Sequence, residues 1–528
     1  MPNPRPRSLG NKPTLGQRLA LVQRAIANNL DQGPPQIIPY RGWKPDRPAL
    51  GNPGEIEATN VLPDMDGYTP WQGLSVQGTE ALDARCQGAF PAEDAAGNVF
   101  IYAGDATKLY QINADDSLHN VSRADGYQTP ADQPWEFVQF GDQVIATNYA
   151  DPVQKATIGS GTFADALTSD LRPKARHVAV IRDFVVTGFT NDGTDGEQPR
   201  RVWWWAINST TDAQPAAATQ SDYQDVPDVS LVQRITGGSE YGLVFTDKTI
   251  ERFTYIGSPL IFQRDTIDEH RGTPIPGSVI RWGKRVFFIA EEGFMVNMGR
   301  GESIPIGDGQ VDKKFWNDFN STYISRVWSA IDPLNKVVIW GFPGESQSTP
   351  GEPNRIWACY YPELRWSEAE IDFQIVFGAR EQGLTLEGLD TISSSIDTLP
   401  FSLDSRAYTG GRLISGAFNS SNRLCFFTGS NLAATIVTGE HQPVRNQRSQ
   451  ITAGRPLVDG GSPTLAVGSR VTPQATPGFT SAAAINNEGL APLNQESRYH
   501  RFRTIVPAES TWDHAQGVEF FATGTGSQ

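Results

Sequence analysis

The stretch Ser278–Trp316 reads SVIRWGKRVFFIAEEGFMVNMGRGESIPIGDGQVDKKFW. Its first two apolar runs, 279–282 and 285–290, are separated by the two-residue turn Gly283-Lys284, which is typical of a β-hairpin. A third apolar run, 294–298, follows after a glycine-containing turn. Three or four short antiparallel strands in about 40 residues form one small sheet, the unit that β-propellers repeat around an axis.

The same alternation of apolar runs and turn residues recurs on both sides of this stretch. Hairpins are expected at 98–112, 137–146, 178–187, 231–245, 326–340 and 354–367. They recur at intervals of roughly 40 to 60 residues, the range expected for propeller blades. The sequence therefore predicts an irregular β-propeller of roughly five to eight blades between about Asn60 and Gly378. A β-sandwich of unrelated hairpins is the alternative, because short apolar runs determine strands better than topology.

Composition and length agree with an all-β protein that has more than one part. The 528 residues include 51 Gly, 37 Pro and 10% aromatic residues, as expected for many strands joined by turns. After the propeller, further strands are expected around 424–427, 465–467 and 499–505. We therefore predict three domains. They are a basic, Pro-rich N-terminal arm with a short helix at 1–53, the β-propeller at 54–385, and a β-rich, sandwich-like domain at 386–528.

The N-terminal arm differs from the rest of the chain in charge. Residues 1–50 carry eight Lys and Arg against two Asp, a net charge of +6, which leaves −21 for the remainder of a chain whose total is −15. Within the arm, helical spacing places four apolar side chains on one side: Leu15, Leu19, Val22 and Ile26. A short helix on Pro-rich tethers has no core of its own, so these four residues are expected to form an assembly interface. A disordered basic tail is the alternative.

The charge of the remaining chain also bears on possible partners. An acidic surface disfavours tight binding to nucleic acid, which requires a basic footprint, but an acidic wall lets DNA pass without adhering. The acidic body is therefore compatible with DNA passing along it, and we expect the arm to contact a neighbouring subunit. Deletion of residues 1–50 is then expected to leave a folded propeller that fails to join the larger particle in which its neighbouring subunits assemble.

Cysteine usage and hydropathy predict where the chain is made. Cys86, Cys359 and Cys425 are widely spaced and odd in number, which favours buried thiols over disulfides or a zinc site. No apolar run approaches the length of a membrane span, and the first residues lack the apolar core of a signal peptide. Synthesis in the cytoplasm, without a membrane segment, is expected.

The sequence contains few residues that would support an enzymatic or sugar-binding function. The histidines show no paired metal spacing, and no nucleotide-binding loop or serine-nucleophile motif is present. The carboxylate pairs Glu291-Glu292 and Asp268-Glu269 are the candidates for a glycosidase, and Trp203-Trp204-Trp205 for a sugar platform. Alternation along a strand instead places Trp203 and Trp205 on one face and Trp204 on the other, as packing between blades requires. We expect no enzymatic activity, no catalytic residue, no cofactor and no metal site.

Four segments, 60–74, 289–311, 389–405 and 498–518, resemble the propeller-bearing tail proteins of short-tailed bacteriophages, which are called tail hub, nozzle or packaged-DNA stabilisation proteins. This resemblance implies a structural protein of the virion tail. It would form a ring of six copies below the portal and adaptor, alongside other tail proteins, which retains the packaged genome and conducts DNA during ejection without sequence-specific contacts. No binding residue transfers from the family. A glycan-binding propeller for a host receptor is the alternative, and exposed aromatic rings in an axial pocket would favour it.

Overall fold

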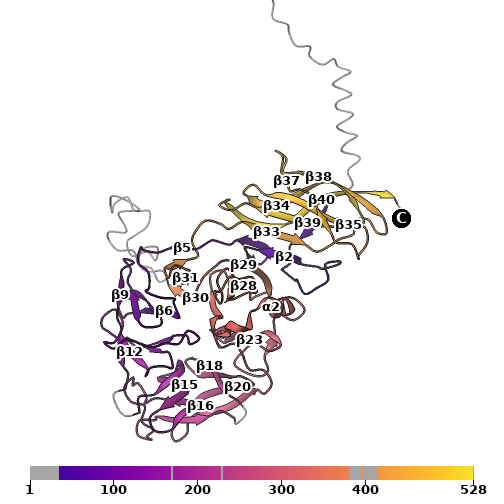
Figure 1. The fold of residues 1–528 in the computed structure, drawn as a ribbon. Helices are drawn as coiled ribbons and strands as arrows, with labels where there is room; N and C mark the ends of the chain where they lie inside the picture. Colours follow the sequence, from indigo (N-terminus) through magenta and orange to yellow (C-terminus); the bar gives the residue numbers. More distant parts are fainter. Residues whose placement is uncertain (1–34, 168–170, 228–229, 381–394, 396–412, 527–528) are drawn as a thin grey trace, which may run out of the picture.

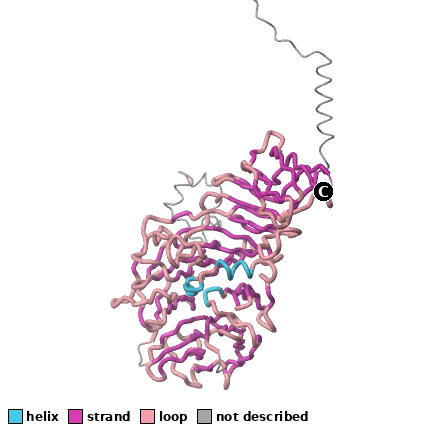
Figure 2. Tube along the Cα trace, turned by 45° about the vertical axis from the view of Figure 1, so that its right-hand side comes forward, coloured by secondary structure: helices cyan, strands magenta, loops and turns pink. Residues whose placement is uncertain are grey.

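The computed structural model describes residues 35–167, 171–227, 230–380, 395 and 413–526 (Figure 1). These residues form strands connected by loops, together with one α-helix, α2 (Asp312–Asp318), and two short 3-10 helices, η1 (Pro276–Ser278) and η2 (Ser321–Arg326). Figure 2 shows how little of the trace is helical. The predicted all-β class is confirmed, and α2 together with its neighbouring turns is the exception.

Seven small antiparallel sheets surround one axis in the lower part of Figure 1 and form the blades of a β-propeller. Blade 1 consists of β6 (Gly88–Glu93), β7 (Val99–Gly104), β8 (Leu109–Ile112) and β9 (Leu118–Asn120). Blade 2 consists of β10 (Glu136–Phe140), β11 (Gln143–Thr147), β12 (Gln154–Thr157) and β13 (Ala164–Asp165). Blade 3 consists of β14 (Lys174–Ile181), β15 (Phe184–Asp192), β16 (Gly196–Trp204) and β17 (Asp222–Asp225). Blade 4 consists of β18 (Val232–Thr236), β19 (Tyr241–Thr246), β20 (Ile250–Gly257) and β21 (Ile261–Asp268). Blade 5 consists of β22 (Ile280–Trp282), β23 (Arg285–Ala290), β24 (Gly293–Asn297) and β25 (Ile304–Pro305).

The last two blades share strands with other parts of the chain. Blade 6 is β26 (Trp328–Asp332), β27 (Val337–Phe342), β28 (Arg355–Tyr360) and β29 (Arg365–Glu370), and it belongs to a larger sheet of ten strands. Blade 7 is β30 (Ile375–Arg380), β31 (Leu413–Phe418), β32 (Leu424–Phe426) and β5 (Ser75–Val76). The hairpins predicted from the sequence thus lie in successive blades, not in two stacked sheets, and the predicted propeller is confirmed.

Neighbouring blades are held together by buried hydrophobic side chains. Each pair of neighbours shares its own cluster, and the ring closes because blades 7 and 1 also share one. Trp203 and Trp205 lie in the cluster between blades 2 and 3, and Trp204 lies in the one between blades 3 and 4. The predicted alternation of these three residues is therefore confirmed: they pack blades together.

Blade 7 closes the ring with segments from distant parts of the sequence. Its outermost strand β5 pairs with β32, and Val76 lies opposite Cys425. Its inner strands β30 and β31 pair with each other, beginning with Ile375 opposite Phe418. The predicted boundary between residues 385 and 386 falls between two paired strands, so the propeller extends beyond it. The sequence did not indicate this, because the change in composition near that boundary lies in the connection between strands of one blade.

The remaining strands form a β-sandwich in the upper part of Figure 1. One sheet contains β1 (Pro35–Pro39), β3 (Val61–Asp64), β4 (Gly67–Pro70), β34 (Arg448–Gly460), β38 (Ala491–Ser497) and β40 (Trp512–Gly526). The other contains β2 (Glu55–Thr59), β33 (Ala434–Thr438), β35 (Thr464–Arg470), β36 (Gly478–Phe479), β37 (Ala483–Ala484) and β39 (Tyr499–Val506). The sandwich therefore combines residues before the propeller with residues after it. The residues before it, 35–70, are those that the sequence predicts to belong to the N-terminal arm and to the start of the propeller.

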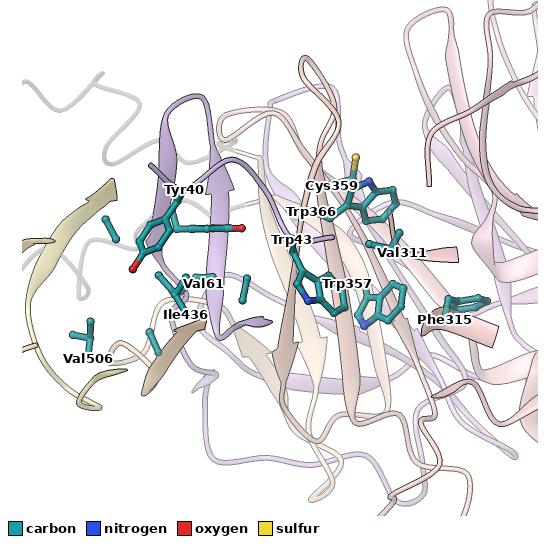
Figure 3. Close-up of a cluster of buried hydrophobic side chains, with 14 of the residues drawn as sticks. Tyr40, Trp43, Val61, Val311, Phe315, Trp357, Cys359, Trp366, Ile436 and Val506 are labelled. Carbon is teal, nitrogen blue, oxygen red and sulfur yellow. The ribbon is translucent and has the colours of Figure 1, made fainter. Parts of the chain in front are cut away.

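The sandwich and the propeller share one sheet and one core. Strand β2 pairs in parallel with β29 of blade 6, where Thr59 lies opposite Glu368. This pairing makes the second sandwich sheet continuous with blade 6. The largest hydrophobic cluster runs across this junction (Figure 3). In it, the ring of Trp43 meets Trp357 of β28 edge-on, with 4.9 Å between the ring centroids.

These contacts correct the predicted N-terminal arm. Tyr40 and Trp43 are buried, and β1 pairs with β40, so residues 35–53 belong to the folded body. Deleting residues 1–50 would therefore remove part of the shared core as well as the arm, and the survival of a folded propeller after this deletion stays a prediction. The predicted interface residues Leu15, Leu19, Val22 and Ile26 lie outside the described residues.

Candidate functional site

A pocket opens at the propeller axis, on the face where the inner strands begin. It has a volume of about 530 Å³ and is lined by residues at or just before the first strands of blades 2 to 6. Its polar and aromatic lining includes Gln133, Arg176, Gln233, Arg234, Ser325 and Trp328. Pockets of this size accommodate small organic ligands, and their polar groups determine which ones.

A buried charge network lies in the wall of this pocket. Glu136, the first residue of β10, is joined by its Oε1 to Nδ1 of His177 at 2.8 Å and to the guanidinium of Arg234. Its Oε2 accepts the backbone N–H of Val178 at 3.3 Å. Burial alone would raise the pKa of the Glu136 carboxyl, but Arg234 and His177 overcome this effect and hold the pKa below its ordinary value. Glu136 is therefore an ionised carboxylate that joins blades 2, 3 and 4.

Arg176, one residue before His177, has no such partner. Its guanidinium lies over the ring of Phe189, with 3.8 Å to the centroid, and near the ring of Tyr149, at 4.9 Å. Its Nε is buried and has no hydrogen-bond acceptor, and no ion pair joins Arg176 to any carboxylate in the described part of the chain. The stacked rings restrict the guanidinium to one orientation while its hydrogen-bonding capacity stays unused.

The remaining lining is neutral and rich in hydrogen-bonding groups. The side chains of Gln133, Gln233 and Ser325 make no hydrogen bond to any residue that the structure describes. The indole Nε1 of Trp328 is buried and likewise unpaired. Gln133, Gln233 and Ser325 are half-buried, so their unpaired polar groups are available to ordered water or to a ligand.

The carboxylate pairs considered for a glycosidase do not form a catalytic arrangement. Asp268 is buried and accepts backbone N–H groups from His270, Arg271 and Ser303, which is the role of a carboxylate that stabilises a turn. Glu292 is exposed and pairs with Arg271 at 3.2 Å, and neither it nor Glu291 lines the axial pocket. The structure therefore does not bring either predicted pair to this site.

The three cysteines and the possible metal ligands do not form a reactive site in the described residues. Cys86, Cys359 and Cys425 are buried free thiols, as predicted, and burial raises the pKa of Cys86 to about 12. Such thiols are poor nucleophiles. Within the described ranges, no three His, Cys, Asp or Glu residues are close enough to hold a metal ion. No helix in those ranges is long and apolar enough to cross a membrane.

Sequence reasoning missed the residues of the axial pocket. Glu136, Arg176, His177 and Arg234 come from three blades and share no motif, so their proximity follows only from the ring. A usable signal was present, because each lies near the start of a first strand in a predicted hairpin. In a propeller these starts converge on one end of the axis.

Comparison with known proteins adds the following findings. Neither a protein-family model nor a curated protein sequence matches this chain. Among solved structures, virginiamycin B lyase from Staphylococcus aureus is similar at 11% identity and a TM-score of 0.36, over 67% of this chain and 98% of the lyase. The extracellular domain of a hybrid two component system from B. thetaiotaomicron is similar at 10% identity and 0.38, over 74% of this chain and 43% of that domain. The computationally designed Ika8 protein is similar at 12% and 0.33, over 67% and 99%. The propeller itself is established by the sheets of this chain.

Proposed function

We propose that this protein is a structural subunit of a short-tailed phage tail. In this role it forms a ring of six copies below the portal and adaptor, holds back the packaged genome and conducts DNA during ejection. The proposal rests on the sequence resemblance described above and on the way in which the resembling segments are used in the fold.

One observation carries the proposal. Three of the four resembling segments, 60–74, 289–311 and 498–518, contribute side chains to the same core, among them Val61, Val311 and Val506 (Figure 3). The fourth segment, 389–405, lies outside the described residues except for Ser395. The resemblance thus includes blade 5 as well as the sandwich strands that pack against it. A propeller recruited as a separate module would show its resemblance in the blades alone.

The junction gives the subunit a form suited to a tube wall. Because β2 continues the sheet of blade 6 into the sandwich, bending between the two parts would break strand pairing and expose the shared core. A subunit that withstands the pressure of packaged DNA needs this stiffness. The net charge of −21 after residue 50 disfavours adhesion of the phosphate backbone to the wall.

The first test is the mass of the full-length chain in solution. Native mass spectrometry and negative-stain electron microscopy are expected to show closed rings, of about 346 kDa if six copies of the 57.7-kDa chain assemble. Purified phage particles from the producing host are expected to contain the chain in the same stoichiometry. A chain that stays monomeric at high concentration and is absent from purified particles would contradict the proposal.

The location of the ring interface is tested with a truncated chain. Removing residues 1–34 deletes five Lys and Arg and one Asp but leaves β1 and the core intact. We expect this variant to remain folded and monomeric, because the predicted helix with Leu15, Leu19, Val22 and Ile26 is lost. Rings of unchanged stability would show that the contacts between subunits lie elsewhere.

A further inference from the structure

The axial pocket holds a fixed cation that the fold does not use. Arg234 and His177 are engaged by Glu136, so the charge in that part of the wall is already compensated. Arg176 is different, because aromatic rings fix it and no carboxylate in the described chain pairs with it. Leaving a partly buried guanidinium uncompensated costs stability. An anionic group from outside the chain would supply the partner that the fold does not.

The charges that oppose an anion are few. Asp132 on the rim is exposed, and Glu136 behind the wall is already ion-paired. A planar guanidinium pairs best with a carboxylate or phosphate, through parallel N–H donors. The single available Arg suits one carboxylate, whereas phosphate sites usually gather several cations or backbone N–H groups.

The rest of the lining selects among carboxylate ligands. Gln133, Gln233 and Ser325 offer unpaired amide and hydroxyl groups, which match ligand hydroxyls. Pro134, Pro274 and Pro276 supply apolar surface, and Trp328 adds a part-buried ring with an unpaired indole N–H. An apolar acid would leave these polar groups unpaired, whereas a hydroxylated ring with one carboxylate satisfies them.

We propose that the axial pocket binds an acidic saccharide, with Arg176 pairing its carboxylate and the Gln133, Gln233 and Ser325 side chains pairing its hydroxyls. This site is independent of the proposed role in a tail, since it requires only the folded propeller. Trp203, Trp204 and Trp205 take no part in it, because they are buried between blades.

The test compares two sugars that differ in one group. Isothermal titration of the full-length chain with D-glucuronate and D-glucose isolates the contribution of the carboxylate. We expect glucuronate to bind and glucose to bind at least about ten-fold more weakly, since a charge-assisted pair contributes more than a neutral one. Binding of neither sugar, or equal binding of both, would overturn the proposal.

Two variants locate the contact, one at Arg176 and a control just beyond the other end of β14. Arg176→Gln is expected to reduce glucuronate affinity to that of glucose and to leave glucose binding unchanged. Arg182→Gln removes a half-exposed Arg just beyond the other end of β14 and is expected to change neither affinity. If Arg176→Gln binds glucuronate as the unchanged chain does, the carboxylate contact is not at Arg176.

A third variant covers the case in which Arg176→Gln does not fold. Ser325→Ala removes a half-buried hydroxyl that lines the pocket. Its expected effect is a several-fold loss of affinity for both sugars, of the size that one hydrogen bond contributes. Unchanged affinity for both sugars in this variant would exclude the assigned pocket.

Discussion

The propeller and the sandwich are both made of short antiparallel strands, but they are assembled differently. Blades 1 to 5 each use a continuous stretch of chain, so most strand partners are the next strand in sequence. The sandwich pairs β1 with β40 and β2 with β33, which joins residues near each end of the described chain. The propeller thus depends mainly on local hairpins, while the sandwich and its junction with blade 6 depend on long-range contacts.

This difference has a direct consequence for stability. Loss of one blade contact weakens two neighbouring sheets, whereas loss of a junction contact affects the sandwich and the propeller together. Each of the following experiments compares a change at the junction or sandwich with a matched change elsewhere.

The largest effect is expected from truncation. Deleting residues 1–50 removes Tyr40, Trp43 and β1, and each buried aromatic contributes about 3–5 kcal/mol, which together approaches the whole stability of a domain. Deleting residues 1–34 removes none of these contacts. We expect the longer truncation to lose the sandwich and the shorter one to unfold at the temperature of the full chain, as measured by calorimetry and limited proteolysis. Equal melting of both would show that residues 35–50 contribute little to the core.

The next effect concerns two buried tryptophans of equal size. Trp357→Ala opens a cavity at the junction, and Trp204→Ala opens one between blades 3 and 4. Each is expected to cost about 3–5 kcal/mol. Hydrogen exchange is expected to rise in both β28 and β39 for Trp357→Ala, but only in blades 3 and 4 for Trp204→Ala. The same exchange pattern in both variants would mean that the junction is not a distinct cooperative unit.

The sequence predicted the local part of this architecture and missed the long-range part. The turns Gly141-Asp142 and Gly283-Lys284 lie between apolar runs, and each pair of runs forms a hairpin in the structure. Nothing local to β5 indicates that Val76 pairs with Cys425, and a single parallel residue pair joins β2 to β29. Contacts of this kind leave no periodic signature in the sequence.

The same limit applies to the candidate site. His177 is one of six histidines and shows no motif, so its partnership with Glu136 and Arg234 becomes visible only when three blades are placed around an axis. The apolar spacing of Leu15, Leu19, Val22 and Ile26 is a local signal, and its assignment as an interface stays a prediction.

The two regions are also expected to respond to pH in opposite directions. Burial raises the pKa of Glu368, beside the junction, to about 7, so the folded chain binds a proton there that the unfolded chain has released. The loss of folding stability caused by Glu368 grows as the pH rises from about 4.5 to 7. This loss amounts to at most about 3 kcal/mol, because the side chain is partly exposed. In the sandwich, burial lowers the pKa of His500, so that stability falls as the pH drops below about 6.5.

Two substitutions separate these opposing effects. Relative to the unchanged chain, Glu368→Gln is expected to gain stability toward pH 7.5, and His500→Gln toward pH 5.5, in urea unfolding followed at both pH values. His119→Gln, which replaces an exposed His in blade 1, serves as the surface control. Parallel stability–pH curves for all three variants would mean that neither buried group changes its protonation on folding.

The smallest effect is expected inside blade 7, where two glycines lie on neighbouring strands. A Cβ added at Gly378 of β30 would meet no atom within 4 Å, and its φ is not in the left-handed region. Alanine there restricts the unfolded chain without a clash, so Gly378→Ala should stabilise the protein by about 0.5–1 kcal/mol. At Gly416 of β31, a Cβ would lie 2.9 Å from Cζ of Phe377 and 3.0 Å from Cβ of Ala379, so Gly416→Ala should be neutral or destabilising. Calorimetric melting of the two variants tests whether this long-range blade is packed as closely as the local ones. If both substitutions stabilise equally, Phe377 moves aside freely, and the blade that closes the ring is looser than the blades built from continuous chain.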